Sequence, residues 1–274
     1  ADIPESAARI TGIVTSTRYP LTADLLDRLP ELRVISSFGV GMDHLPQAEA
    51  RARGIAVHNT PGVLDHDTAD MALALALALT RRIVTNHDHV ASGDWGRTAA
   101  PPLGVSLSGK TVGIAGLGAI GSIVAQRFRA FGCHIAYFGR RRRADCHYDF
   151  HETPKALAAA SDLLVATLPG GPETRGIIDA AVFSALGPQG YFINIGRGSA
   201  VDQPALIEAL QNDVIAGAGL DVFQNEPQVP ESLRVMSNVV LQPHQASATA
   251  ETRARMADLV LENLVRHYTE RAAC

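Results

Sequence analysis

One short segment limits the possible folds of this chain more than any other. The apolar run 111–115 is followed at once by a G-x-G-x-x-G element and then by a helical pattern that continues to residue 131. In a strand–turn–helix unit of this kind Gly116 makes the tight turn, Gly118 leaves the backbone bare, and Gly121 lets the helix pack closely on the strand. The N–H groups at the start of such a helix bind phosphate. The sequence therefore predicts a dinucleotide-binding loop formed by Gly116, Leu117, Gly118, Ala119, Ile120 and Gly121.

The alternation of strands and helices continues on the C-terminal side of this loop. Helical patterns separate several of the strand patterns there, so we expect the strands to be parallel. Six strands with helical crossovers predict an α/β fold, a doubly wound Rossmann domain over residues 61–246. The strand patterns lie at 111–115, 134–138, 163–166, 191–195, 215–220 and 239–241.

The first part of the chain predicts a second, smaller α/β domain. Residues 10–58 read as strand, helix, strand, helix and strand, and the turn 59–62 then breaks the pattern. A long helical pattern at 250–268 can return to this region. We therefore expect residues 1–60 and 247–274 to form a flavodoxin-like substrate domain with a parallel sheet.

Leucine and alanine alternate between Met71 and Leu79. A period of two favours a strand. However, both residues are strong helix formers, and Asp65, Asp67 and Asp70 supply the negative charge that the first turns of a helix favour. We predict a helix that is apolar nearly all round, buried either inside one subunit or against a second one.

Composition argues against several classes of protein. The 274 residues are 46% hydrophobic, and a formal net charge of −4 gives no attraction to nucleic acid or to an anionic membrane. The apolar run 71–79 is far shorter than a membrane span of about 20 residues. Cys133, Cys146 and Cys274 show neither a disulfide framework nor metal-ligand spacing. We expect no metal, and a location in the reducing cytoplasm.

The end of the second Rossmann strand indicates which dinucleotide is used. An enzyme that uses NAD places an acid about 20 residues beyond the glycine loop, where it binds the ribose hydroxyls. Here Gly139 offers neither bulk nor negative charge, and the forked donors of Arg140 and Arg141 suit the 2′-phosphate of NADP(H). Arg142 and Arg143 are expected only to solvate the loop. A nucleic-acid patch is disfavoured because no aromatic residues are interleaved with the arginines.

Three polar residues follow predicted strands, at the sheet edge where α/β proteins bind ligands. Arg197 lies between two glycines, on a bare backbone that suits it to clamp a carboxylate with two parallel hydrogen bonds. Glu226 and His244 follow the next two strands. A lone arginine more often makes a surface ion pair, and a lone histidine is more often a satisfied polar residue. Their shared location favours a site.

Together these motifs resemble the D-isomer-specific 2-hydroxyacid dehydrogenase family, in particular its NADPH-dependent hydroxypyruvate, glyoxylate and hydroxyphenylpyruvate reductases. The resemblance rests on the glycine loop, the arginine-rich tip and the segments 59–64, 195–198, 218–227 and 243–244, in the family's order. It spans nearly the whole chain. Members of the family have a further strand and helix before the region that begins here, so the resemblance also implies a first domain shortened at its N-terminus.

The resemblance implies a reaction, the reduction of a small 2-oxo acid to the D-2-hydroxy acid with NADPH as the hydride donor. Arg197 would bind the substrate carboxylate, and His244 would be the general acid. Glu226 would accept a hydrogen bond from the other imidazole nitrogen and favour the protonated ring. The resemblance also implies a homodimer. It further implies cofactor contacts at Leu168, Ile195 and Asp221, and substrate contacts from the backbone of Val40 and Gly41.

Two other functions use the same residues. One is a non-catalytic NAD(P)-sensing protein, similar to the corepressors that resemble these dehydrogenases. The other is an NAD-dependent dehydrogenase of the same family. Steady oxidation of NADPH with a 2-oxo acid argues against the first, and a side-by-side titration of the two cofactors distinguishes the second.

Overall fold

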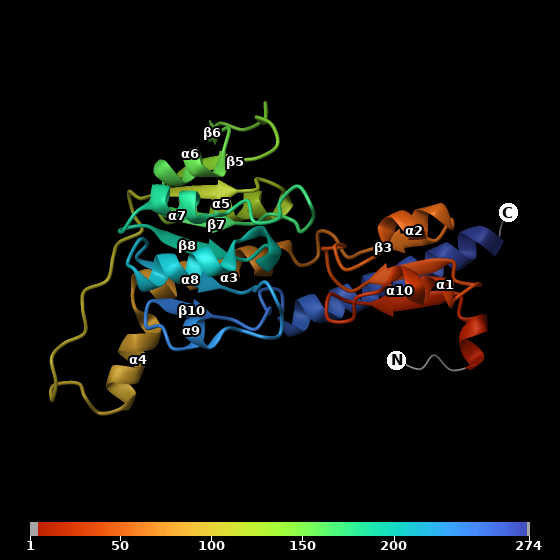
Figure 1. Cartoon of the computed structure of the whole chain (residues 1–274), viewed down its shortest axis with the longest axis horizontal. Coiled ribbons are helices and arrows are strands. Elements are labelled where there is room, and N and C mark those ends of the chain that lie inside the picture. Colours follow the sequence, from red (N-terminus) through yellow and green to blue (C-terminus); the bar gives the residue numbers. More distant parts are fainter. Residues whose placement is uncertain (1–4, 273–274) are drawn as a thin grey trace. The chain divides into compact units, whose positions relative to one another are not determined.

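The computed structural model describes residues 5–272, and the chain separates into two compact units (Figure 1). The small unit consists of Ala1–Asp65 and Ser247–Cys274, and the large unit consists of His66–Ala246. Each contains its own parallel β-sheet and its own hydrophobic core. Among the described residues, no helix is both long enough and apolar enough to span a membrane.

The sheet of the large unit has seven parallel strands in the order β10-β9-β8-β7-β4-β5-β6. The chain winds outward from β4 to β6, then crosses back to β7 and winds the other way, so the order of a doubly wound sheet is present and the predicted fold class is confirmed. All six predicted strands are found, and β6 is an additional edge strand. The strands are β4 (Thr111–Ala115), β5 (His134–Phe138), β6 (Asp149–His151), β7 (Leu163–Ala166), β8 (Tyr191–Asn194), β9 (Gly217–Leu220) and β10 (Val239–Leu241).

Helices cover both faces of this sheet. Because side chains alternate along a strand, Val112 and Ile114 of β4 pack into one core, whereas Ala115 packs into the other. The core of Val112 also contains side chains from α3 (Asp65–Thr80) and α5 (Ala119–Ala130). The opposite core contains side chains from α6 (Pro154–Ala159), α7 (Ala180–Leu186), α8 (Gln203–Gln211) and α9 (Glu231–Arg234).

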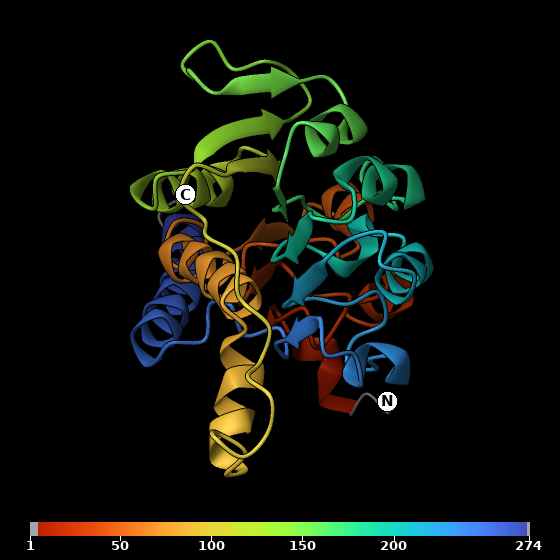
Figure 2. The same cartoon turned by 90° about the vertical axis from the view of Figure 1, so that its left-hand side faces the viewer.

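The alternating leucine–alanine run forms a helix, α3, as expected. Its burial is uneven, because Leu75 and Leu79 are buried while Leu73 and Leu77 are only partly covered and Ala74 is exposed. The single chain therefore does not cover the helix on all sides, and burial against a second subunit stays a prediction. Beyond α3, Arg82 has a φ of 52°, in the left-handed region, and the chain continues as α4 (Ile83–Ala91) and an extended segment to residue 110. Both views show this arm projecting from the sheet of the large unit (Figures 1 and 2).

The small unit has three parallel strands in the order β1-β2-β3. Its long helix, α10, packs on β2 and buries Met256 and Val260. The first α-helix has a side-chain cap, since the Thr22 hydroxyl accepts a hydrogen bond from the Leu25 N–H at 3.2 Å. The elements are η1 (Glu5–Arg9), β1 (Gly12–Thr15), α1 (Ala23–Asp27), β2 (Val34–Ser37), α2 (Gln47–Ala52), β3 (Ala56–His58) and α10 (Ala250–Ala272).

Candidate active site

The glycine-rich loop joins β4 to α5 in the large unit. Gly116 has a φ of 104°, a conformation that side chains with a Cβ rarely adopt. A Cβ on Gly121 would collide with the Gly116 carbonyl oxygen, so this glycine is required for α5 to approach the loop. By contrast, a Cβ placed on Gly118 would meet no atom within 4 Å. The turn and the close helix packing therefore leave open space beside the middle glycine, as a bound pyrophosphate requires.

A threonine at the end of β7 braces this loop from the neighbouring strand. The Thr167 hydroxyl donates to the Gly116 carbonyl oxygen at 2.5 Å and lies 3.3 Å from that of Ala115. Leu168 follows it and is largely buried, as is Ile195 beyond β8. Only a small part of either side chain is available to a cofactor. Thr167 was not among the predicted site residues, because its contact with the loop spans two strands that are distant in the sequence.

The arginine-rich tip follows β5 at the same end of the sheet. Arg140 and Arg141 are exposed, and among the described residues no acid pairs with either of them. Gly139 leaves their backbone uncrowded, since a Cβ there would have its nearest neighbour, the Arg141 carbonyl oxygen, at 3.9 Å. The two guanidinium groups are thus available to an anion. Together with the loop geometry, the tip fits a dinucleotide that carries a 2′-phosphate.

Backbone crowding fixes the segment that carries Arg197. A Cβ on Gly196 would lie 2.6 Å from the Leu168 carbonyl oxygen, and one on Gly198 would overlap the Phe223 carbonyl group. The buried Asn194 adds two hydrogen bonds, because its amide accepts from the Gly196 N–H and donates to the Arg197 carbonyl oxygen, both at 3.1 Å. The two glycines and Asn194 therefore hold the Arg197 segment against the ends of β7 and β9.

His244 and Glu226 are in direct contact. The Nδ1 atom of His244 lies 2.6 Å from Oε2 of Glu226, and about one third of each side chain is exposed. The other carboxylate oxygen of Glu226 accepts from the Phe223 N–H at 2.9 Å. The structure thus brings together two residues that are 18 positions apart, and the charge of Arg197 acts on the same carboxyl group.

The ionisation state of Glu226 determines which nitrogen of the His244 ring donates the hydrogen bond between them. Burial raises the pKa of Glu226, but the hydrogen bond and charge of His244, the Phe223 N–H and the charge of Arg197 together outweigh it, so the pKa is lowered. The carboxylate is therefore ionised near neutral pH and can only accept hydrogen bonds. Nδ1–H of His244 must donate to it, which leaves Nε2 as the atom that can exchange a proton with a ligand.

Asp221 organises the backbone around His244. Its carbonyl oxygen accepts from the His244 N–H at 2.9 Å, and its two carboxylate oxygens accept from the Gln245 and Ala246 N–H groups at 2.8 and 3.0 Å. His244 itself has a φ of 53°, in the left-handed region. Burial raises the pKa of Asp221, and the two N–H groups partly oppose the rise. One residue, itself only 1% exposed, thus binds three consecutive N–H groups.

The predicted substrate loop at Val40 and Gly41 lies in the small unit. The Asn59 amide donates to the Val40 carbonyl oxygen at 2.8 Å, and the Thr60 hydroxyl accepts from the Gly39 N–H at 3.1 Å. Neither bond uses the N–H group of Val40 or Gly41. The turn that follows β3 therefore holds this loop. Its residues Asn59 and Thr60 do not bind the N–H groups of Val40 and Gly41.

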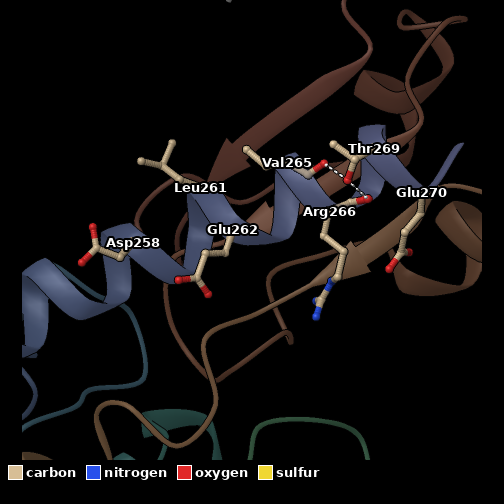
Figure 3. Close-up of a pocket in the computed structure, with 7 residues that line it drawn as sticks. All are labelled: Asp258, Leu261, Glu262, Val265, Arg266, Thr269 and Glu270. Carbon is tan, nitrogen blue, oxygen red and sulfur yellow. Dashed lines mark hydrogen bonds between the residues drawn. The ribbon is translucent and has the colours of Figure 1, made fainter. Parts of the chain in front are cut away.

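Outside this site, the described residues form a shallow hollow but no metal-binding group. Among the described residues, no group of three or more His, Cys, Asp or Glu side chains is arranged to bind a metal ion. A shallow hollow on α10 is drawn in Figure 3, where the Thr269 hydroxyl bonds only to carbonyl oxygens of its own helix. It is open to solvent and contains none of the predicted site residues. Its lining comes from one helix: Asp258, Leu261, Glu262, Val265, Arg266, Thr269 and Glu270.

The chain is similar in sequence to proteins of known family. The family model described as "D-isomer specific 2-hydroxyacid dehydrogenase, NAD binding domain" matches residues 73–246. The chain is 47% identical over 265 residues to a 2-ketogluconate reductase of Gluconobacter oxydans, covering 97% of this chain and 85% of the relative. It is 46% identical over 263 residues to a hydroxyphenylpyruvate reductase of Plectranthus scutellarioides, covering 96% of this chain and 84% of the relative.

A solved structure gives the same result. It is an NADPH-dependent glyoxylate/hydroxypyruvate reductase of Sinorhizobium meliloti in complex with NADP and malonate, with a TM-score of 0.93 and 45% identity, covering 97% of this chain and 83% of that one. The family that the sequence motifs resemble is confirmed by the model match and by these relatives. The chain belongs to the D-isomer specific 2-hydroxyacid dehydrogenase family.

Proposed function

We propose that this protein is an NADPH-dependent reductase that converts small 2-oxo acids into D-2-hydroxy acids. The contact between His244 and Glu226, with the charge of Arg197 acting on the same carboxylate, is the observation that carries the proposal. The relatives that reduce 2-ketogluconate, hydroxyphenylpyruvate, glyoxylate or hydroxypyruvate support it.

The chemistry divides among three side chains. NADPH, when bound, supplies the hydride that reduces the 2-oxo carbon. Arg197 binds the substrate carboxylate through its forked donors and holds the acid in position. His244 delivers a proton from Nε2 to the carbonyl oxygen, and Glu226 keeps the ring oriented through the hydrogen bond with Nδ1.

The proposed cofactor contacts come from the glycine loop and the arginine tip. The N–H groups at the start of α5 would bind the pyrophosphate of the cofactor, and Arg140 and Arg141 would pair with its 2′-phosphate. The open space beside Gly118 and the exposure of both arginines support this assignment. We assign further cofactor contacts to Leu168, Ile195 and Asp221, and a second carboxylate contact to the N–H groups of Val40 and Gly41.

A spectrophotometric assay tests the function. NADPH oxidation is followed at fixed enzyme concentration with glyoxylate, hydroxypyruvate, 2-ketogluconate and phenylpyruvate, and the product is analysed on a chiral column. We expect turnover with at least one acid, a D product, and a lower Kd for NADPH than for NADH. Absence of turnover with every acid would overturn the reductase, and equal use of NADH would overturn the cofactor assignment.

We further propose that the protein is a homodimer joined through α3 and the arm that follows it. The arm exposes two large apolar side chains, Trp95 at 77% and Leu103 at 93%, and α3 leaves Leu73 and Leu77 partly uncovered. A two-fold interface between identical arms would bury these side chains. A cytoplasmic location stays a prediction that rests on the cysteine pattern.

Analytical ultracentrifugation tests the dimer. Leu103→Asp places a charge in the proposed interface and should shift the protein toward the mass of one chain. Leu261→Asp, on α10 of the small unit and 59% exposed, is the matched control and should leave the mass unchanged. A monomeric wild-type protein at micromolar concentration would contradict the proposal.

A further inference from the structure

One arginine of the tip differs from its neighbours. Arg140, Arg141 and Arg142 are exposed, whereas the side chain of Arg143 is only 38% exposed. Its Nε and Nη2 atoms donate to the two carboxylate oxygens of Asp145 at 3.1 and 2.6 Å. Such a bidentate pair fixes the plane of the guanidinium group as well as its position. Arg143 therefore does not merely solvate the loop, and that expectation is wrong.

The third nitrogen of the same guanidinium group reaches the glycine loop. Nη1 of Arg143 donates to the Leu117 carbonyl oxygen at 3.0 Å and to the Ser122 hydroxyl oxygen at 3.1 Å. The Ser122 hydroxyl in turn donates to the Gly118 carbonyl oxygen at 2.7 Å. Arg143 is thus tied to the carbonyl groups of two consecutive residues of the loop, one directly and one through Ser122.

The backbone of Arg143 is anchored as well. Its N–H donates to the hydroxyl group of Tyr137 at 2.8 Å, and Tyr137 is a fully buried residue of β5. The segment 139–142 consequently leaves β5 at Phe138 and is fixed again at residue 143. Both ends of this four-residue bridge are held, while the side chains of Arg140 and Arg141 extend from it into solvent.

We propose that Arg143, oriented by Asp145, is a positioning residue for the 2′-phosphate of NADP(H), because it holds the Arg140–Arg141 segment against the glycine loop. This inference rests on the NADPH-dependent function proposed above. Four of the five N–H donors of Arg143 are used by Asp145, Leu117 and Ser122, so it has little capacity left for the phosphate itself. Its effect is to order the segment before the cofactor arrives, which lowers the entropy lost on binding.

The Asp145→Asn variant tests this role because the two possible roles of Arg143 predict opposite signs. If Arg143 positions the segment, loss of the carboxylate loosens it and weakens binding of the 2′-phosphate. If Arg143 binds the phosphate directly, the variant frees its guanidinium group, removes a nearby negative charge and tightens binding. The Asp145 side chain is 69% exposed, so the substitution costs little folding stability.

Isothermal titration calorimetry of the full chain with 2′,5′-ADP and 5′-ADP gives the readout without turnover. We expect Asp145→Asn and Arg143→Lys to weaken 2′,5′-ADP binding by about three- to tenfold and to change 5′-ADP binding by less than about twofold, as expected for the ordering of one or two long side chains. Asp149→Asn, which removes the same charge from β6 without a contact to Arg143, is the matched control and should change neither affinity.

The outcomes separate the two proposals. A wild-type protein that binds 5′-ADP as tightly as 2′,5′-ADP would overturn the NADPH assignment itself. If the wild type prefers 2′,5′-ADP, then tighter, unchanged or equally weakened binding of both ligands by Asp145→Asn would overturn only the positioning role. Selective loss of 2′,5′-ADP affinity in Asp145→Asn and Arg143→Lys, absent from Asp149→Asn, supports it.

Discussion

The cluster of Arg197, Glu226 and His244 and the arginine tip are built in different ways within the large unit. In the cluster, crowded glycines and a buried asparagine fix the backbone beside Arg197, and a buried aspartate fixes the backbone beside His244. In the tip, Arg140 and Arg141 extend into solvent from a short segment. One neighbour, Arg143, links this segment to the glycine loop by hydrogen bonds. The proposed reacting groups are thus positioned by buried backbone contacts, whereas the proposed cofactor-selecting groups are positioned by the side chain of one neighbouring arginine. Substitutions in the first should change rates, and those in the second should change affinity for one cofactor.

The largest expected effect is that of His244→Ala. Removal of the proposed general acid should lower kcat by about 10²- to 10⁴-fold. NADPH binding, measured by fluorescence titration, should stay close to that of the wild type. An activity within a few-fold of the wild type would show that the cluster does not perform the proton transfer.

Arg197→Ala should follow in size. Loss of the charge-assisted hydrogen bonds to the substrate carboxylate should lower kcat/KM by about 100-fold, with KM raised and kcat lowered. Steady-state kinetics with the preferred 2-oxo acid measure both constants. An unchanged KM would remove Arg197 from carboxylate binding.

The double variant Arg140→Ala, Arg141→Ala tests the tip. We expect the Kd for NADPH to rise by about 10- to 50-fold while that for NADH changes little, because only the phosphate contacts are lost. Fluorescence titration with each cofactor gives the ratio. An equal rise for both cofactors would indicate general damage to the loop rather than lost selectivity.

Glu226→Gln should have a smaller effect on rate. The amide still accepts a hydrogen bond from Nδ1 of His244 but lacks the negative charge of the carboxylate, so we expect kcat to fall by about tenfold. Steady-state kinetics with the preferred 2-oxo acid measure this fall. A kcat equal to that of the wild type would exclude a role for the charge of Glu226.

The smallest effect concerns acid stability. Because the pKa of Glu226 is lowered from its ordinary value of 4.5, its charged form stabilises the folded state above that value, and this contribution disappears as the pH falls below it. The Tm of the wild type should therefore fall more than that of Glu226→Gln between about pH 5 and pH 3. Parallel curves would mean that the pair contributes nothing to stability.

The fold could be predicted from the sequence wherever a strand is buried on both faces. Runs such as 112–115 and 163–166 are continuously apolar because helices cover both sides of the sheet, and all six predicted Rossmann strands are present. The strand β6 escaped prediction because it is a three-residue edge strand with polar ends, Asp149 and His151. The helix α4 escaped it because none of its residues is buried, so it has no apolar stripe facing a core.

The site was only partly predictable for a related reason. Arg197, Glu226 and His244 each follow a strand, and a parallel sheet brings such positions to one edge. No local pattern reveals that Asp221 binds the N–H groups after β10, or that Arg143 contacts a loop 26 residues earlier. Those contacts depend on tertiary packing, and four consecutive arginines look alike in a sequence.

Because Asp221 binds the backbone N–H groups of Gln245 and Ala246 rather than their side chains, any residue except proline at position 245 can keep the hydrogen bond that fixes the chain next to His244. The exposed Gln245 can therefore be exchanged without moving the imidazole. Residue 245 is accordingly a good starting point for directed evolution of this enzyme, since diversity introduced there leaves the scaffold around it intact.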